Sequence, residues 1–284
     1  MFNIDEEKMA SVVSGFQVPV KPKVLQEMQD VMDEEEPDIN RVAEIISSDI
    51  GLSSSILKVI NSPYYGMSRT ISEIKQAVMI IGLKTVNSLV TSLLLKAALQ
   101  GKASISLERF WDDSLDVANA MLFIGHKVKD KVPVDMLYTI GLFQNCGIPL
   151  LALRYEDYKE VLIEANNTGC NSILLEEEKY NTNHAVLGYF IATSWHLPKE
   201  ICEIILQHHN TRFFDTILGN EAQIALATLK IAENLVERVK RHSVSPDWEE
   251  LEPTVLDVLG LSTVDFTDLE DDYFDLYSQL GSDV

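Results

Sequence analysis

The sequence predicts an all-α protein, and three observations support this fold class. Apolar residues recur every three or four positions along nearly the whole chain, which is the period of one helix face. No segment shows the sustained two-residue alternation of a half-buried strand, and no tight Asn-Gly or Asp-Gly hairpin occurs. Of the 284 residues, 46% are hydrophobic and 24% are charged, so the chain can bury a core and lacks a disordered composition.

The first hundred residues predict a helical bundle. Helical periodicity covers 21–33, starts again after Pro37-Asp38, and continues over 50–60, 74–81 and 83–99. The segment Asn61-Ser62-Pro63-Tyr64-Tyr65-Gly66 interrupts it, because proline disfavours helix before it and glycine permits a turn after it. Residues 101–104 are typical of a junction, so we expect a first unit over 1–101.

The rest of the chain predicts a helical core and an acidic extension. Helices are expected over 111–129, 133–146, 155–166, 172–180, 183–195, 198–209 and 221–241, within a second unit over 102–245. From Pro246 onward there are twelve acidic residues and no Lys or Arg, yet Leu, Phe and Tyr are frequent. This apolar content predicts that residues 246–284 dock on the core as a helix, capped by Ser262 or Thr263.

Charge and composition exclude several classes of function. The net charge is −21, and a surface this acidic repels nucleic acids and anionic lipid, so neither is an expected partner. The N-terminus lacks the basic start and apolar run of a signal peptide, and no stretch approaches the roughly 18–20 apolar residues of a membrane span. The three cysteines form no disulfide framework. These features predict a reduced, cytoplasmic protein.

Histidine is the main concentration of ligand-type residues. The chain has no Gly-rich phosphate loop and no GxSxG nucleophile elbow. His184 begins one predicted helix, and His208-His209 ends another. Adjacent helical residues point about 100° apart, so at most one of that pair is expected to face a given site. The three side chains are compatible with structural hydrogen bonding or with binding of a ligand or metal, and both alternatives stay open.

Other notable residues have structural explanations. Cys146 is expected to be a small buried hydrophobe, because no base is placed beside it. Asn61 is expected to hydrogen-bond its own turn, and Tyr64 and Tyr65 to be packing anchors. His126 lies beside lysine and is expected on the surface.

An ordered series of short motifs resembles a known family over about residues 16–242. Among them are Ser48-Asp49-Ile50-Gly51-Leu52, the 61–66 segment, Ile80-Ile81-Gly82-Leu83, Gly141-Leu142-Phe143, His184-Ala185-Val186-Leu187-Gly188, Trp195-His196-Leu197-Pro198 and His208-His209. In these the chain is similar to the HDOD family, the HD-related output domains of bacterial signalling proteins. The resemblance implies an N-terminal bundle packed on a core like that of the HD-superfamily phosphohydrolases.

The departures from the HD pattern concern the metal-binding pair. The resemblance aligns Gln144 with the histidine, and Asn145 with the aspartate, of the HD doublet, and Asp113 with an upstream histidine. It implies a remnant pocket in which the remaining histidines converge near the two amides. We expect no bound metal and no other cofactor; His184, His208 and Asp113 are the weak metal candidates. The residues expected to form the remnant pocket are Asp113, Gln144, Asn145, His184, His208 and His209.

The favoured functional hypothesis is a non-catalytic signalling module that engages a partner protein, with a pocket that holds its own hydrogen bonds or a small polar ligand. The alternative is a metal-dependent phosphohydrolase acting on a phosphate ester or cyclic nucleotide. A purely structural scaffold is a third hypothesis. Metal content separates the second from the other two.

Overall fold

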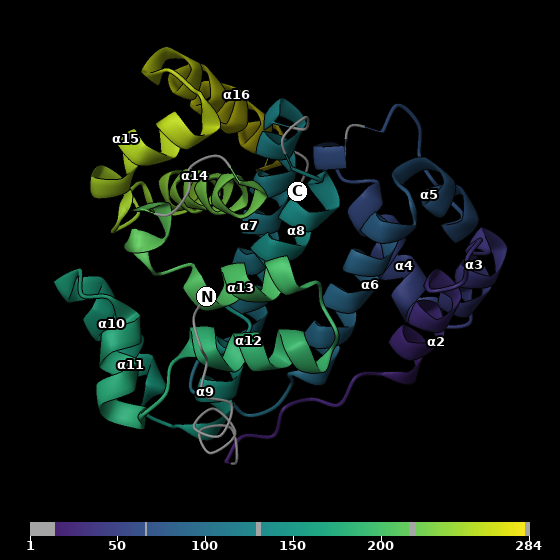
Figure 1. The fold of residues 1–284 in the computed structure, drawn as a ribbon, viewed down its shortest axis with the longest axis horizontal. Coiled ribbons are helices and arrows are strands. Elements are labelled where there is room, and N and C mark those ends of the chain that lie inside the picture. Colours follow the sequence, from purple (N-terminus) through teal and green to yellow (C-terminus); the bar gives the residue numbers. More distant parts are fainter. Residues whose placement is uncertain (1–14, 66, 129–131, 216–219, 282–284) are drawn as a thin grey trace.

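The computed structural model describes residues 15–65, 67–128, 132–215 and 220–281 (Figure 1). Over these residues the regular structure is helical throughout, with no strand. The all-α fold class is therefore confirmed. The N-terminal helices gather at one end of the molecule, and the acidic C-terminal helices lie at another, on α14 (Glu221–Arg241).

The N-terminal bundle contains α2 (Lys23–Met32), α3 (Ile39–Ser47), α4 (Ile50–Ile60), α5 (Ile74–Ile81) and α6 (Leu83–Ala98). Aspartates start two of these helices. The Asp38 side chain accepts a hydrogen bond from the backbone of Asn40, and that of Asp49 accepts one from Leu52. Apolar faces meet inside the bundle, and α6 also packs on α8 (Val134–Phe143). Helix α6 therefore connects the bundle to the rest of the protein.

The side chain of Asn61 holds the segment after α4 in place through hydrogen bonds. The Asn61 amide donates to the carbonyls of Leu57 and Ile71, at 2.9 and 2.7 Å, and its oxygen accepts from the Ile71 backbone at 2.7 Å. These bonds reach ten residues ahead, beyond the single turn expected from the sequence. Tyr64 and Tyr65 form a short 3₁₀ turn and are buried. Gly66, the last residue of the motif, lies outside the described residues.

The central part of the fold is built on α7 (Leu107–Val128), which packs against α8 and α14. Helix α13 (Lys199–Gln207) packs on α8 and α14, and α12 (His184–Ser194) packs on α13 and on α9 (Ile148–Arg154). Helices α10 (Tyr158–Thr168) and α11 (Ser172–Tyr180) lie at the edge of the molecule, beside α9 and α12 (Figure 1). Pro133 precedes α8 and Pro198 precedes α13, positions where the missing N–H costs no helical hydrogen bond.

The acidic extension docks, as two helices where one was expected. These are α15 (Trp248–Leu259) and α16 (Thr263–Gly281), which pack on α14, and α16 also contacts α7. Ser262 and Asp265 exchange hydrogen bonds at the start of α16, so the expected cap is present. Apolar side chains of both helices are buried, including Trp248, Phe266 and Tyr273.

One apolar stretch is longer than the sequence analysis allowed. Residues Met136–Arg154 are long and apolar enough, by length and composition alone, to cross a membrane. The stretch joins α8 to α9, and 78% of its apolar window is buried inside the fold. That degree of burial is typical of a core helix of a soluble protein, because the apolar surface is already covered by other helices.

Candidate functional site

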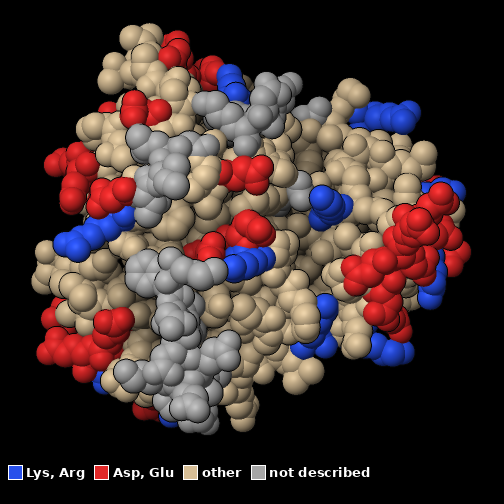
Figure 2. All heavy atoms as spheres, viewed as in Figure 1, with Lys and Arg blue, Asp and Glu red and all other residues tan. Residues whose placement is uncertain are grey.

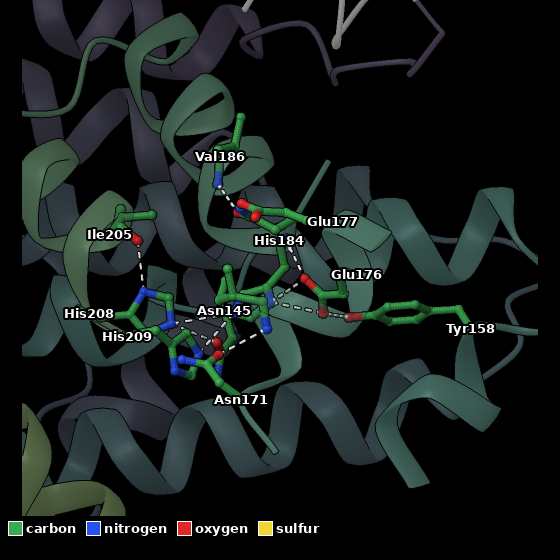
Figure 3. A network of polar contacts seen from close by, with 12 residues as sticks. Asn145, Tyr158, Asn171, Glu176, Glu177, His184, Val186, Ile205, His208 and His209 are labelled. Carbon is green, nitrogen blue, oxygen red and sulfur yellow. Dashed lines mark hydrogen bonds and ion pairs between the residues drawn. The ribbon is translucent and has the colours of Figure 1, made fainter. Parts of the chain in front are cut away.

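The candidate site lies where the start of α12 meets the turn between α8 and α9. Asn183 caps α12 by accepting a hydrogen bond from Val186 at 2.9 Å, which makes His184 the first residue of the helix. Gly147 permits a close approach here, because a Cβ at this position would lie 2.0 Å from the carbonyl oxygen of His184. The approach brings His184 into the same cluster as Asn145 (Figure 3).

A buried glutamate holds His184 in place. Nδ1 of His184 lies 2.8 Å from Oε2 of Glu176 and 2.9 Å from Oε1, and the His184 backbone N–H donates to Oε2 at 2.8 Å. Tyr158 donates its hydroxyl to Oε1 at 2.6 Å. Because a carboxylate only accepts, the His184 ring carries its hydrogen on Nδ1 and presents Nε2 to the other histidines.

Glu176 and Tyr158 were not predicted from the sequence as site residues. A signal for Glu176 was present, because it shares one face of its helix with Ile173 and Tyr180, at spacings of three and four residues. A carboxylate on an apolar face needs a buried partner. Burial acts to raise the pKa of Glu176, but its interactions with His184 and the hydrogen bond from Tyr158 outweigh burial and hold that pKa below its ordinary value.

Both members of the His208-His209 pair face His184, contrary to the helical expectation. Nε2 of His208 lies 3.4 Å from Nε2 of His184, and Nε2 of His209 lies 3.1 Å from the same atom. The reason is that α13 ends at Gln207. His209 therefore lies in a turn beyond the helix, where the 100° rotation between successive residues no longer applies.

The asparagine aligned with the HD aspartate contacts this cluster. Oδ1 of Asn145 lies 3.1 Å from Nε2 of His208. Gln144 is also buried, and its Oε1 atom has no hydrogen-bond partner within the part of the chain that the structure describes. Asn145 and the three histidines therefore lie together in one contact network, with Gln144 next to it in the chain.

One arrangement of hydrogens gives the Nε2 atom of each ring a hydrogen-bond partner without a charge on any ring, and it leaves no hydrogen between Nε2 of His184 and Nε2 of His208. Nδ1 of His208 donates to the Ile205 carbonyl at 2.7 Å, which leaves a lone pair on its Nε2. Asn145 can donate to that lone pair after a half-turn of its amide, and His209 can donate from Nε2 to His184. Burial lowers the pKa of His208 and of His209 well below the ordinary value, and neighbouring imidazoles add to the effect. Both rings are therefore neutral near pH 7.

The donor set does not fit the two-metal centre that an HD doublet would build. In the alignment that the resemblance implies, Asn145 is a neutral amide at the position of an anionic bridging ligand, and Gln144 is at the position of an imidazole. Three imidazole nitrogens remain, and they all lie within 4.8 Å of one another. Glu176 and the Ile205 carbonyl orient two of the rings through Nδ1, as in many histidine metal sites. The set therefore fits one transition-metal ion and lacks the groups for a carboxylate-bridged pair.

Asp113 does not belong to this cluster, which corrects the set taken from the resemblance. Its carboxylate pairs with Lys240 and with Arg241, the latter at 3.0 Å. Lys240 lies ten residues further along α14 than Lys230, whose charge acts on His208 and His209. At 1.5 Å per helical residue this is about 15 Å. Asp113 therefore binds the far end of α14, away from the histidines.

A groove with both polar and apolar lining opens beside the cluster. It has a volume of about 370 Å³ and reaches His209, and its lining includes Glu177, Asn183 and Gln207. The described residues that line it include no Lys or Arg. Amide and imidazole groups can exchange hydrogen bonds with a neutral polar molecule, whereas a phosphate group would find no cation along this lining.

The curated relatives are distant and longer than this chain. One is an uncharacterised protein of Treponema pallidum (strain Nichols), 24% identical over 194 residues, which are 68% of this chain and 38% of the relative. Another is the uncharacterised protein YuxH of Bacillus subtilis (strain 168), 35% identical over 71 residues, or 25% of this chain and 17% of the relative. The matches therefore span well under half the length of either relative.

Solved structures share the fold at low identity. An HDOD domain protein of unknown function from Geobacter sulfurreducens has a TM-score of 0.69 and 21% identity, covering 98% of this chain and 95% of its own. A candidate phosphohydrolase from Shewanella amazonensis SB2B has a TM-score of 0.71 and 20% identity, covering 95% and 94%. A candidate signal transduction protein from Marinobacter aquaeolei VT8 has a TM-score of 0.68 and 17% identity, covering 98% and 65%. The model of the HDOD domain family matches residues 18–211, more than half of the sequence, and with the shared fold this shows that the chain belongs to the HDOD domain family.

Proposed function

We propose that this chain is a non-catalytic signal-transduction module of the cytoplasm, which acts by binding a partner protein. The observation that carries the proposal is the contact between Asn145 and His208, with Oδ1 and Nε2 3.1 Å apart. An amide occupies the position where the resemblance places the aspartate of an HD doublet. A neutral amide binds divalent cations weakly and cannot bridge two of them as an anion.

The surroundings of the cluster support the same proposal. His184 and His208 are each only 1% exposed, and together with Glu176, Tyr158 and Asn145 they form a connected polar network. A buried network with its hydrogen bonds satisfied fixes the packing of the helices that carry it. The groove beside it suits a small polar ligand, and the net charge of −21 favours a protein partner over nucleic acid or membrane.

A hydrolysis assay tests this proposal. Wild-type protein is incubated with bis-p-nitrophenyl phosphate and with a cyclic dinucleotide in the presence of Mn²⁺, beside a His184→Ala variant. The proposal predicts that the wild-type rate equals the rate of the variant. Turnover that His184→Ala abolishes would refute it, because the histidine cluster would then be supporting the reaction.

The second candidate is a metal-dependent phosphohydrolase, which one observation favours. One ring nitrogen from each of His184, His208 and His209 lies within 4.8 Å of the other two, and Glu176 orients the first ring through Nδ1. Zn²⁺ binds imidazole nitrogen at about 2.0–2.1 Å, so three such nitrogens can ligate one ion. This candidate requires His209 to move its hydrogen from Nε2 to Nδ1. When bound, the ion would act as a Lewis acid toward a phosphate oxygen.

A further inference from the structure

A groove lies on the surface of the N-terminal bundle. It lies between α3 and α4, ends at the start of α5, and has a volume of about 600 Å³. On α3 its wall includes Asn40, Glu44 and Ser47, and on α4 it includes Ser54 and Leu57. These residues repeat at three- and four-residue steps, so each helix presents one continuous stripe to the groove. We call it the α3–α4 groove.

Much of the lining of this groove consists of apolar and small side chains, which leave room for a docked helix. Ile50 lines it and is 81% exposed, the largest exposed fraction among the large hydrophobic side chains of the described helices. Leu57 lies seven residues further along the same wall, and Ala43 and Ser53 are small. Small residues let the backbone of a docked helix approach closely, while Ile50 and Leu57 offer apolar area that a partner can bury.

The rim of the groove is acidic. Glu44 and Glu73 line it, against Lys75 as the one cation among its lining residues. Asp38 accepts hydrogen bonds from the lining residue Asn40, and Asp49 caps α4 directly before Ile50. Figure 2 shows a band of acidic side chains over the α2 and α3 end of the molecule, with Lys and Arg side chains beside it. The acidic rim would therefore attract a positively charged segment.

We propose that the α3–α4 groove docks a basic amphipathic helix of a partner protein, an inference that rests on the proposed function and specifies its partner. Apolar side chains of that helix, spaced at three- and four-residue steps, pack on Ile50 and Leu57. Its Lys and Arg residues pair with Glu44, Glu73 and the neighbouring aspartates. A second copy of this chain is a poor occupant, because two acidic surfaces repel each other.

Peptide binding to the full-length protein tests the inference. The probe is a synthetic helix with Leu on one face and Lys elsewhere, and its control is a peptide of the same composition with the Leu residues scattered around the helix. Binding is measured by fluorescence anisotropy at physiological salt. We expect the patterned peptide to bind at least about tenfold more tightly than the scattered one.

Matched variants locate the binding site. Ile50→Ser and Glu44→Lys change the groove, whereas Val264→Ser and Glu249→Lys remove an exposed apolar side chain and reverse an exposed acid on the C-terminal helices. All four positions are exposed, so the variants are expected to fold. The groove variants should weaken peptide binding about tenfold, and the controls less than about twofold.

Three results would overturn the inference. One is equal affinity for the two peptides, and another is equal weakening by groove and control variants, since both indicate nonspecific charge attraction. The third is self-association that Ile50→Ser abolishes, which would make a second copy the occupant. These results leave the hydrolysis assay unaffected, and turnover in that assay leaves the peptide result unaffected, so the two proposals fail separately.

Discussion

Glu176 accepts hydrogen bonds from both the ring and the backbone of His184, with Oε2 lying 2.8 Å from Nδ1 and 2.8 Å from the backbone nitrogen. The carboxylate is fully buried and also accepts the hydroxyl of Tyr158. One side chain therefore satisfies the first N–H of α12, fixes the tautomer of His184 and directs its Nε2 toward His208 and His209. The geometry of the whole cluster depends on this pair.

Removing the His184 ring should destabilise the protein. In His184→Ala the buried carboxylate of Glu176 loses its ring partner, and we expect the free energy of unfolding to fall by about 1–3 kcal/mol. Urea denaturation measures the change. His126→Ala is the control, because His126 is exposed on α7 and should cost less than about 0.5 kcal/mol. Equal costs for the two variants would show that the network contributes nothing.

The histidine cluster should make stability depend on pH. Burial lowers the pKa of His208 and of His209 in the folded protein, so the unfolded chain takes up their protons first as the pH falls. Stability from these rings is therefore present above the unfolded pKa of about 6.5 and is lost progressively below it. Partial neutralisation of the −21 net charge acts in the opposite direction.

A comparison with a variant isolates this contribution. Unfolding free energies are measured from pH 8 to pH 5 for wild type, His208→Asn and the surface control His126→Asn. We expect stability to fall more steeply toward pH 5 in wild type and His126→Asn than in His208→Asn. Parallel curves for wild type and His208→Asn would contradict the neutral assignment of His208.

The convergence of the histidines was implied by the family resemblance, while its geometry was not. Periodicity placed His208 and His209 on one helix, where only one could face a site. The structure ends α13 at Gln207, and no residue in 207–210 is a strong helix breaker such as proline or glycine. Glu176 was missed because its neighbours Glu177 and Glu178 make the segment resemble a solvated acidic face. Burial of one acid among three depends on tertiary packing.

The Asn61 side chain should stabilise the conformation of the segment between α4 and α5. Its side chain makes hydrogen bonds to Leu57 and, in both directions, to Ile71. Asn61→Ala leaves the Ile71 backbone groups without these partners, and we expect a loss of about 2–4 kcal/mol from several bonds of roughly 1 kcal/mol each plus desolvation. Thermal unfolding measures it, with Asn166→Ala on the exposed face of α10 as the control. A decrease in melting temperature no larger than that of the control would contradict the prediction.

Docking of the acidic extension should contribute to global stability. Phe266 on α16 is 5% exposed and lies with its ring centroid 5.1 Å from that of Trp248. Phe266→Ala should cost about 3–5 kcal/mol through lost burial and a cavity. Val264→Ala, on the same helix but 67% exposed, should cost less than about 0.5 kcal/mol. Deleting residues 246–284 should lower the melting temperature further; an unchanged value would mean that the extension is not part of the core.

Docking of the acidic extension was predicted from the sequence, but its division into two helices and its ion pairs were not. Its apolar content against twelve acids predicted docking, because solvated acidic tails lack that many large apolar residues. The division into α15 and α16 follows from Gly260, which adopts φ 66° and ends the first helix. Its ion pairs, Arg238 with Glu270 and Lys127 with Asp272 at 3.1 Å, join residues far apart in the chain, so no local pattern reveals them.

The metal content of the protein tests the central claim most directly. Purified wild type and a Gln144→His/Asn145→Asp variant are loaded with Mn²⁺, Fe²⁺ or Zn²⁺, dialysed and measured by elemental analysis. The account predicts fewer than two equivalents of metal per wild-type chain, because no carboxylate bridges the site, and a higher content in the variant, which regains an imidazole and an anionic ligand. Two tightly held equivalents in the wild type would contradict it.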